Sequence, residues 1–146
     1  LKVREIIGLM SITAVPRTPD FVSGVINLRG KVISTIDLRL KFGMPGAERT
    51  EETCIIVVDV GGVAMGIIVD KVSEVMDISP DHIEDAPSFG VAVDTDFILG
   101  MGKTGNRVTI LLDIGKVLSS EDIVALASAA KAVNVPASDD KENSDD

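Results

Sequence analysis

The sequence predicts an all-β fold that ends in a single helix. At least seven short apolar segments, rich in valine and isoleucine, follow one another closely along the chain, and such residues favour strands. Three pairs of these segments are separated only by tight-turn residues, at Arg29-Gly30, Gly61-Gly62 and within 103–106. Short strands joined in this way indicate an antiparallel sandwich or small barrels rather than a parallel α/β sheet.

The strand predictions follow the chain in order. They cover residues 3–10, 22–28, 31–37, 53–60, 63–70, 97–102 and 107–113, and the segment 71–78 alternates in a similar way. After the first strand, Pro16 and Pro19 predict an extended or turning connection, because residues before proline avoid the helical region. Polar loops are expected over 41–52 and 79–90, the second with one short helical turn.

The predicted helix begins after residue 119, where Ser119 stands at the position of an N-cap. Its apolar residues recur at helical spacing, at Ile123, Leu126, Ala127, Ala130 and Val133. The last residues, 136–146, are acidic and contain too few apolar side chains to form a core. We therefore expect a folded domain over 1–135 and a disordered acidic tail over 136–146.

Composition argues against several classes of function. The net charge of −9 and the pI near 4.5 disfavour a nucleic-acid-binding protein, which needs a basic surface, and disfavour docking on an anionic membrane. The apolar runs are far shorter than a membrane span. Cys54 is the only cysteine, so an internal disulfide is impossible and a reducing, cytoplasmic compartment is expected.

Motifs for catalysis or cofactor binding are weak. The stretch GMGKTG at 100–105 matches the dinucleotide pattern, but a predicted strand follows where that motif requires a helix, so a hairpin turn is favoured. His82 is the single histidine and has no evident partners for a metal site or a triad. Asp37, Asp70 and Asp113 each end a strand, where a structural role is favoured over paired catalytic carboxylates. The sequence therefore predicts no enzyme, no metal and no cofactor.

An interaction with other proteins is the remaining class, and Arg29 is its first candidate. Two predicted strands hold Arg29 at the tip of a hairpin, where its planar donor group can meet a partner without distorting the core. The second Leu-Arg pair, at Leu38-Arg39, follows a strand, and its arginine is expected to be solvated or locally paired. Small domains of this composition bind partners through exposed apolar patches or sheet edges.

Several segments together resemble the CheW family of bacterial chemotaxis coupling proteins. They are VREI at 3–6, GVINLRG at 24–30, GIIVDKVSEV at 66–75 and ILLD at 110–113, in the family order over about residues 2–118. The resemblance implies two intertwined five-stranded SH3-like β-barrels with a C-terminal helix. It also implies first strands that precede Leu1, so the domain is expected to be N-terminally incomplete. The family usually has proline where Ser34 stands, which leaves the local strand geometry open.

The resemblance further implies a non-enzymatic adaptor. Such an adaptor joins the cytoplasmic tips of membrane-bound chemoreceptors to the regulatory domain of the histidine kinase CheA, through protein contacts in signalling arrays. The alternative is a CheW-like regulatory module of a larger signalling protein, such as the C-terminal domain of a chemotaxis kinase. The implied partner-binding residues are Val3, Glu5, Gly24, Arg29, Gly66, Val72, Val75 and Gly100. From the residues alone, a core position is as good an explanation of the valines as partner binding, and a turn is as good an explanation of the glycines.

Overall fold

The computed structural model describes residues 3–85, 97–118 and 120–134. The chain forms two compact units. The first unit comprises Leu1–Ser73 together with Ser120–Asp146, and the second comprises Glu74–Ser119. The chain therefore leaves the first unit once and returns to it. The acidic tail predicted over 136–146 lies outside the described residues.

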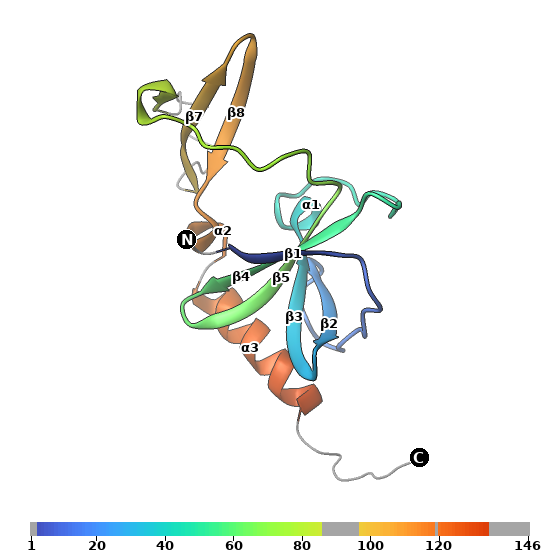
Figure 1. Cartoon of the computed structure of the whole chain (residues 1–146). Helices are drawn as coiled ribbons and strands as arrows, with labels where there is room; N and C mark the ends of the chain where they lie inside the picture. Colours follow the sequence, from blue (N-terminus) through green and yellow to red (C-terminus); the bar gives the residue numbers. More distant parts are fainter. Residues whose placement is uncertain (1–2, 86–96, 119, 135–146) are drawn as a thin grey trace. The chain divides into compact units, whose positions relative to one another are not determined.

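One five-stranded sheet forms the first unit (Figure 1). Its strands, in spatial order, are β1 (Val3–Gly8), β4 (Cys54–Val60), β5 (Val63–Val69), β3 (Lys31–Asp37) and β2 (Val22–Leu28). Neighbouring strands run antiparallel, except that β3 and β5 run parallel. The predicted hairpin turns at Arg29-Gly30 and Gly61-Gly62 are both confirmed. β3 is continuous through Ser34, so the strand tolerates serine at this position.

Contacts beyond the strand ladder draw the two edges of this sheet together. After β1 the chain passes along β2, where Thr13 and Val25 exchange two backbone hydrogen bonds of 2.8 Å each. Ile7 on β1 and Leu28 on β2 pack against the same interior cluster. That cluster consists of Ile26, Ile33, Ile55, Val57 and Ile68. The all-β fold class is confirmed, and this curled sheet is consistent with an SH3-like barrel.

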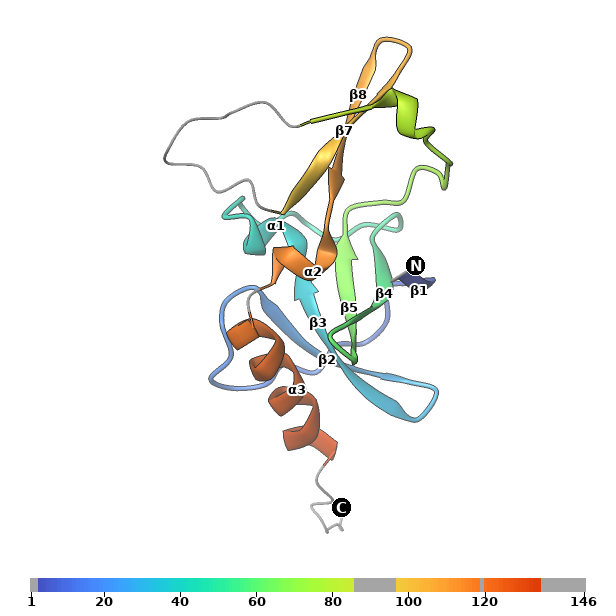
Figure 2. The same ribbon diagram turned by 90° about the vertical axis from the view of Figure 1, so that its left-hand side faces the viewer.

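The predicted C-terminal helix is confirmed as α3 (Ser120–Asn134), although Ser119, its expected N-cap, lies outside the described residues. The helix lies across β2 and β3 (Figure 2) and inserts the fully buried Leu126. Ser34 donates a buried hydrogen bond of 2.5 Å to the carbonyl oxygen of Leu126. At the start of the helix, Lys41 pairs with Asp122 at 2.7 Å. These contacts fasten the last element to the sheet.

The second unit contains a three-stranded antiparallel sheet in the order β6 (Ile83–Glu84), β7 (Ile98–Thr104) and β8 (Arg107–Leu112). The short helical turn predicted before β6 is confirmed as η1 (Pro80–His82). β7 and β8 form the predicted hairpin, so the GMGKTG stretch is strand and turn rather than a nucleotide loop. A second short helix, α2 (Ile114–Val117), follows, and Asp113 caps it by accepting a hydrogen bond from the Gly115 N–H at 3.0 Å.

One pattern in the sequence suggested a strand that the structure does not have. The alternating segment 71–78 is not a strand, because no described strand pairs with it and a strand needs a neighbour for its backbone groups. The second unit has three strands among its described residues. The residues after Asp37 form a short helix, α1 (Leu38–Lys41), since the Asp37 carboxylate accepts the N–H groups of Arg39 and Leu40. Within the described residues, no helix is both long and apolar enough to span a membrane.

Candidate protein-interaction site at the Arg29 hairpin

Arg29 occupies an unusual backbone conformation at the tip of the β2–β3 hairpin. Its φ angle is +53° and that of Gly30 is +86°, as in the two-residue turns that suit the twist of a hairpin. The Asn27 side chain fastens the turn by accepting a hydrogen bond of 2.8 Å from the Gly30 N–H. Asparagine and glycine adopt this left-handed conformation readily, whereas a long side chain adopts it at a cost. Local backbone chemistry therefore does not explain an arginine at this position.

The Arg29 side chain forms a two-pronged ion pair with Glu5 on β1. Nη1 donates to one carboxylate oxygen at 2.9 Å and Nη2 to the other at 2.7 Å. The hydrogen bond from Arg29 lowers the pKa of Glu5 from its ordinary value, and Glu5 raises the pKa of Arg29. The arginine side chain is 70% exposed and the glutamate 32%, so the pair contributes little to folding stability. It instead presents a fixed, charged group at the surface.

Glu5 also begins a row of paired residues that crosses all five strands of the sheet. The row runs from Glu5 to Val57, Gly66, Thr35 and Gly24. A Cβ atom on Gly66 would lie 2.7 Å from Ile55 Cγ2 and 3.0 Å from Thr35 Cγ2. Gly24 has φ +141°, and a Cβ atom there would lie against the Thr13 carbonyl. Both glycines are buried, and close packing alone accounts for them.

The remaining sequence-predicted site residues differ in exposure. On the first unit, Val3 lies on the edge strand β1 and is 40% exposed, and Val72 is half-buried. On the second unit, Val75 is 85% exposed, so a core position is excluded for it in the described structure. Gly100 is buried in β7, where a Cβ atom would approach the Glu84 carbonyl at 2.7 Å. The partner-binding roles of all these residues stay predictions.

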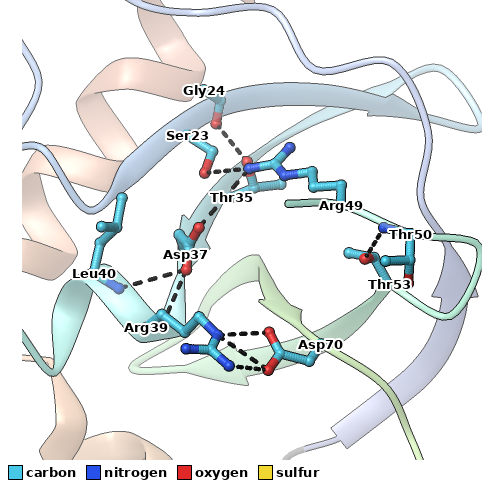
Figure 3. A network of polar contacts seen from close by, with 10 residues as sticks. All are labelled: Ser23, Gly24, Thr35, Asp37, Arg39, Leu40, Arg49, Thr50, Thr53 and Asp70. Atoms are coloured by element: carbon cyan, nitrogen blue, oxygen red, sulfur yellow. Dashed lines mark hydrogen bonds and ion pairs between the residues drawn. The ribbon is translucent and has the colours of Figure 1, made fainter. Parts of the chain in front are cut away.

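Arg39, which the sequence left either solvated or locally paired, forms an ion pair with a residue 31 positions further along the chain. Its Nε and Nη2 atoms donate to the two oxygens of Asp70 at 2.8 and 2.6 Å (Figure 3). The hydrogen bond from Arg39 lowers the pKa of Asp70. Arg49 lies 4.0 Å from Asp37 and 3.4 Å from the Ser23 hydroxyl in the same network. Asp37 and Asp113 cap helices and Asp70 is paired, so each of the three carboxylates has a structural role.

Two features of this surface were not predicted from the sequence. The contact between Glu5 and Arg29 joins residues 24 positions apart, and only tertiary structure brings them together. Ile6 on β1 and Leu9 just after it are, like Val3, exposed by about two fifths of their surface, and the sequence pattern assigned neither residue to the core or to the surface. Position at the edge of the sheet explains this exposure, because β1 pairs only with β4 among the described strands, and the sequence pattern alone does not show which strand lies at an edge. The first unit thus presents an apolar edge beside a fixed ion pair.

Comparison with known proteins identifies the family of this chain. The family model described as a CheW-like domain matches residues 1–122. The chain belongs to the CheW-like family. A chemotaxis protein CheW of Klebsiella aerogenes is 43% identical over 132 residues, which cover 90% of this chain and 80% of that protein. The CheW of Bacillus subtilis is 40% identical over 110 residues, covering 75% and 70%.

A solved CheW structure supports the same assignment. The scaffolding protein TtCheW of Thermoanaerobacter tengcongensis matches with a TM-score of 0.74 and 36% identity, covering 83% of this chain and 82% of that one. The family model, the sequence identities and the fold therefore agree, and they assign the chain to the chemotaxis scaffolds of the CheW-like family.

Proposed function

We propose that the protein is a non-enzymatic adaptor that couples the cytoplasmic tips of chemoreceptors to the regulatory domain of the histidine kinase CheA. Membership of the CheW-like family supports this proposal. The observation that carries it is the Glu5–Arg29 pair, in which an arginine holds a costly backbone conformation for an exposed ion pair. Because the exposed ion pair contributes little to folding stability, contact with a partner explains the arrangement better than stabilisation of the fold does.

The surface assigned to partner contact on the first unit has two parts. Apolar contact comes from Val3 and Ile6 on β1 and from Leu9 just after it, which are each about two fifths exposed and can accept the apolar face of a helical partner. Arg29 and Glu5 add a charged group of fixed geometry, suited to carboxylates or carbonyl groups. Gly24 and Gly66 act indirectly in this proposal, by allowing the sheet to pack closely beneath it.

Three residues complete the proposed set. Val72 on the first unit and Val75 on the second are direct contacts, the latter because it is almost fully exposed. Gly100 acts through packing within the second unit. The protein would be cytoplasmic and reach membrane-bound receptor arrays through these contacts alone. A kinase-borne regulatory module is the less favoured alternative, since the chain covers about four fifths of the Klebsiella CheW.

A turn-preserving substitution tests this function directly. Arg29→Asn removes the charged side chain and creates an Asn-Gly turn, which favours the same backbone conformation. We expect binding to a receptor cytoplasmic fragment, to the CheA regulatory domain, or to both to weaken about tenfold or more, measured by isothermal titration calorimetry. The free energy of unfolding is expected to stay unchanged or to rise by about 1 kcal/mol, because the left-handed strain is relieved.

Arg107→Asn is the matched control, since Arg107 is an exposed arginine at the start of β8 and forms no ion pair with the described residues. Its binding to both partners should equal that of the unmodified protein. Unchanged binding of Arg29→Asn would remove Arg29 from the interface. Absence of binding by the unmodified chain to either partner at micromolar concentration would contradict the adaptor function itself.

A further inference from the structure

The first unit contains a hollow beside α1 that none of the proposed contacts uses. Its volume is about 460 Å³, within the usual range of ligand-binding pockets. The wall is apolar and includes Leu38, Phe42, Met44 and Ile68. Met44 is 45% exposed, although it belongs to this apolar wall, so the hollow is open on one side. An open apolar hollow suits a side chain presented by another protein better than an enclosed small molecule.

The rim of this hollow carries more positive than negative charge. The Asp70 carboxylate is already neutralised by the Nε and Nη2 atoms of Arg39. Among the described residues, Arg39 Nη1 has no hydrogen-bond partner and the exposed Lys71 forms no ion pair. In a chain of net charge −9, this rim is therefore a local cationic site that an acidic group complements.

We propose that this pocket receives one apolar side chain of a partner protein that is flanked by a carboxylate. The apolar side chain fills the hollow against Phe42 and Met44, and the carboxylate pairs with Lys71 at the rim. A segment with a basic residue in place of the carboxylate would be repelled by Lys71, whose charge Asp70 does not offset because Asp70 is paired with Arg39, and would bind less well. This site extends the proposed adaptor function, on which it rests only for the identity of the partner.

Methionine labelling tests the chemistry of the pocket without any partner. The chain has five methionines, so ¹³C labelling of their methyl groups provides five probes. The ligands are the blocked dipeptides Ac-Leu-Glu-NH₂ and Ac-Leu-Lys-NH₂, titrated into the full chain. We expect a saturable shift of the Met44 signal with Ac-Leu-Glu-NH₂, at a dissociation constant of about 1 mM, and a weaker response to Ac-Leu-Lys-NH₂.

Charge reversal at the rim makes this test specific. Lys71→Glu should invert the preference, so that Ac-Leu-Lys-NH₂ binds about threefold to tenfold more tightly than Ac-Leu-Glu-NH₂. Lys116→Glu, which changes an exposed lysine outside the pocket, should leave the preference unchanged. Met76 is 44% exposed and lies outside the pocket, so its signal should not move. Absence of a saturable Met44 shift, an equal shift of Met76, or a preference that survives Lys71→Glu would overturn the proposal.

A second measurement separates failure of the pocket from failure of the adaptor function. Met44→Gln should weaken binding of the receptor fragment or of the CheA regulatory domain about fivefold, whereas Met76→Gln should not. If the unmodified chain binds a partner and Met44→Gln binds equally well, the pocket proposal is wrong and the adaptor function stands. If the unmodified chain binds neither partner, the adaptor function is wrong, and the dipeptide titration alone decides the pocket.

Discussion

Two arginines that follow leucines, Arg29 and Arg39, each bind a carboxylate through two nitrogen atoms. Their settings differ. Arg39 lies in α1 and pairs with the residue after β5, so its ion pair fastens a helix to a strand end. Arg29 lies at an exposed turn and links the β2–β3 hairpin to β1, but its exposure means that this link contributes little to folding stability. At the scale of single residues, the same chemistry therefore serves structure in one place and is available for binding in the other.

The Glu5–Arg29 pair has a measurable consequence at this scale. Because Arg29 lowers the pKa of Glu5, the carboxylate is ionised and paired at neutral pH, and the pair is lost as pH falls through that lowered pKa. Arg29→Ala should raise the pKa of Glu5 towards its ordinary value, which ¹³C NMR titration of the side-chain carboxyl carbon would measure. Arg39→Ala should raise the pKa of Asp70 instead. An unchanged pKa of Glu5 in Arg29→Ala would contradict the ion pair.

At the scale of elements, the row of paired residues across the sheet explains why a glycine lies on each side of Thr35. Thr35 is fully buried in β3, with Gly24 beside it on β2 and Gly66 beside it on β5. Its hydroxyl group donates a hydrogen bond of 3.1 Å to the Gly24 carbonyl. Side chains on both neighbours would crowd Thr35, because paired residues of adjacent strands point to the same face. The glycines therefore let the sheet curl tightly around a buried threonine.

Gly66→Ala tests this packing. The added methyl group would need Ile55 and Thr35 to move, so we expect the free energy of unfolding to fall by about 1–3 kcal/mol in urea denaturation. Gly8→Ala on β1 is the control, because no atom lies within 4 Å of a Cβ placed there. It should change stability by less than about 0.5 kcal/mol. Equal stability of the two variants would show that the sheet has room at Gly66.

At the scale of the whole molecule, the chain completes its first unit with its last described element. α3 follows the second unit in sequence, yet it covers β2 and β3 of the first unit. The Ser34–Leu126 hydrogen bond joins residues 92 positions apart, and both side chains are buried. The second unit is thus an insertion between the sheet of the first unit and its covering helix. The first unit therefore gains its covering helix, with the buried Leu126, only after the chain returns from the insertion.

A pair of substitutions on α3 measures how strongly this return stabilises the protein. Leu126→Ala should lower the free energy of unfolding of the first unit by about 2–5 kcal/mol, because it leaves a cavity beneath the helix. Val124→Ala changes a residue on the same helix that is 64% exposed, and should have little effect. Urea denaturation of both variants provides the comparison. A loss at Leu126 no larger than that at Val124 would mean that the sheet does not depend on α3.

The sequence by itself determined the local elements of this protein. Alternation, β-branched residues and tight-turn dipeptides located seven of the eight described strands to within one or two residues, and helical spacing located α3. The two-residue strand β6 lies in a segment that was expected to be a loop. It also placed Arg29 at a hairpin tip and excluded a nucleotide loop at 100–105. These features depend on residues only a few positions apart, so their chemistry is contained in short stretches. The alternating pattern at 71–78 did not produce a strand. Alternation describes a single segment and does not show whether a neighbouring strand exists to pair with it.

Only the tertiary structure decided which residues meet. It paired Glu5 with Arg29 and Arg39 with Asp70, made β3 and β5 parallel, and showed that Gly24 and Gly66 are needed for packing around Thr35. It also showed that Val75 is exposed, whereas the sequence was equally consistent with a core position for this residue. Such contacts join residues tens of positions apart, and they form only when the sheet closes and each side chain finds its place among many others. Pattern and turn chemistry cannot specify these distances, because they act along the chain and not across it.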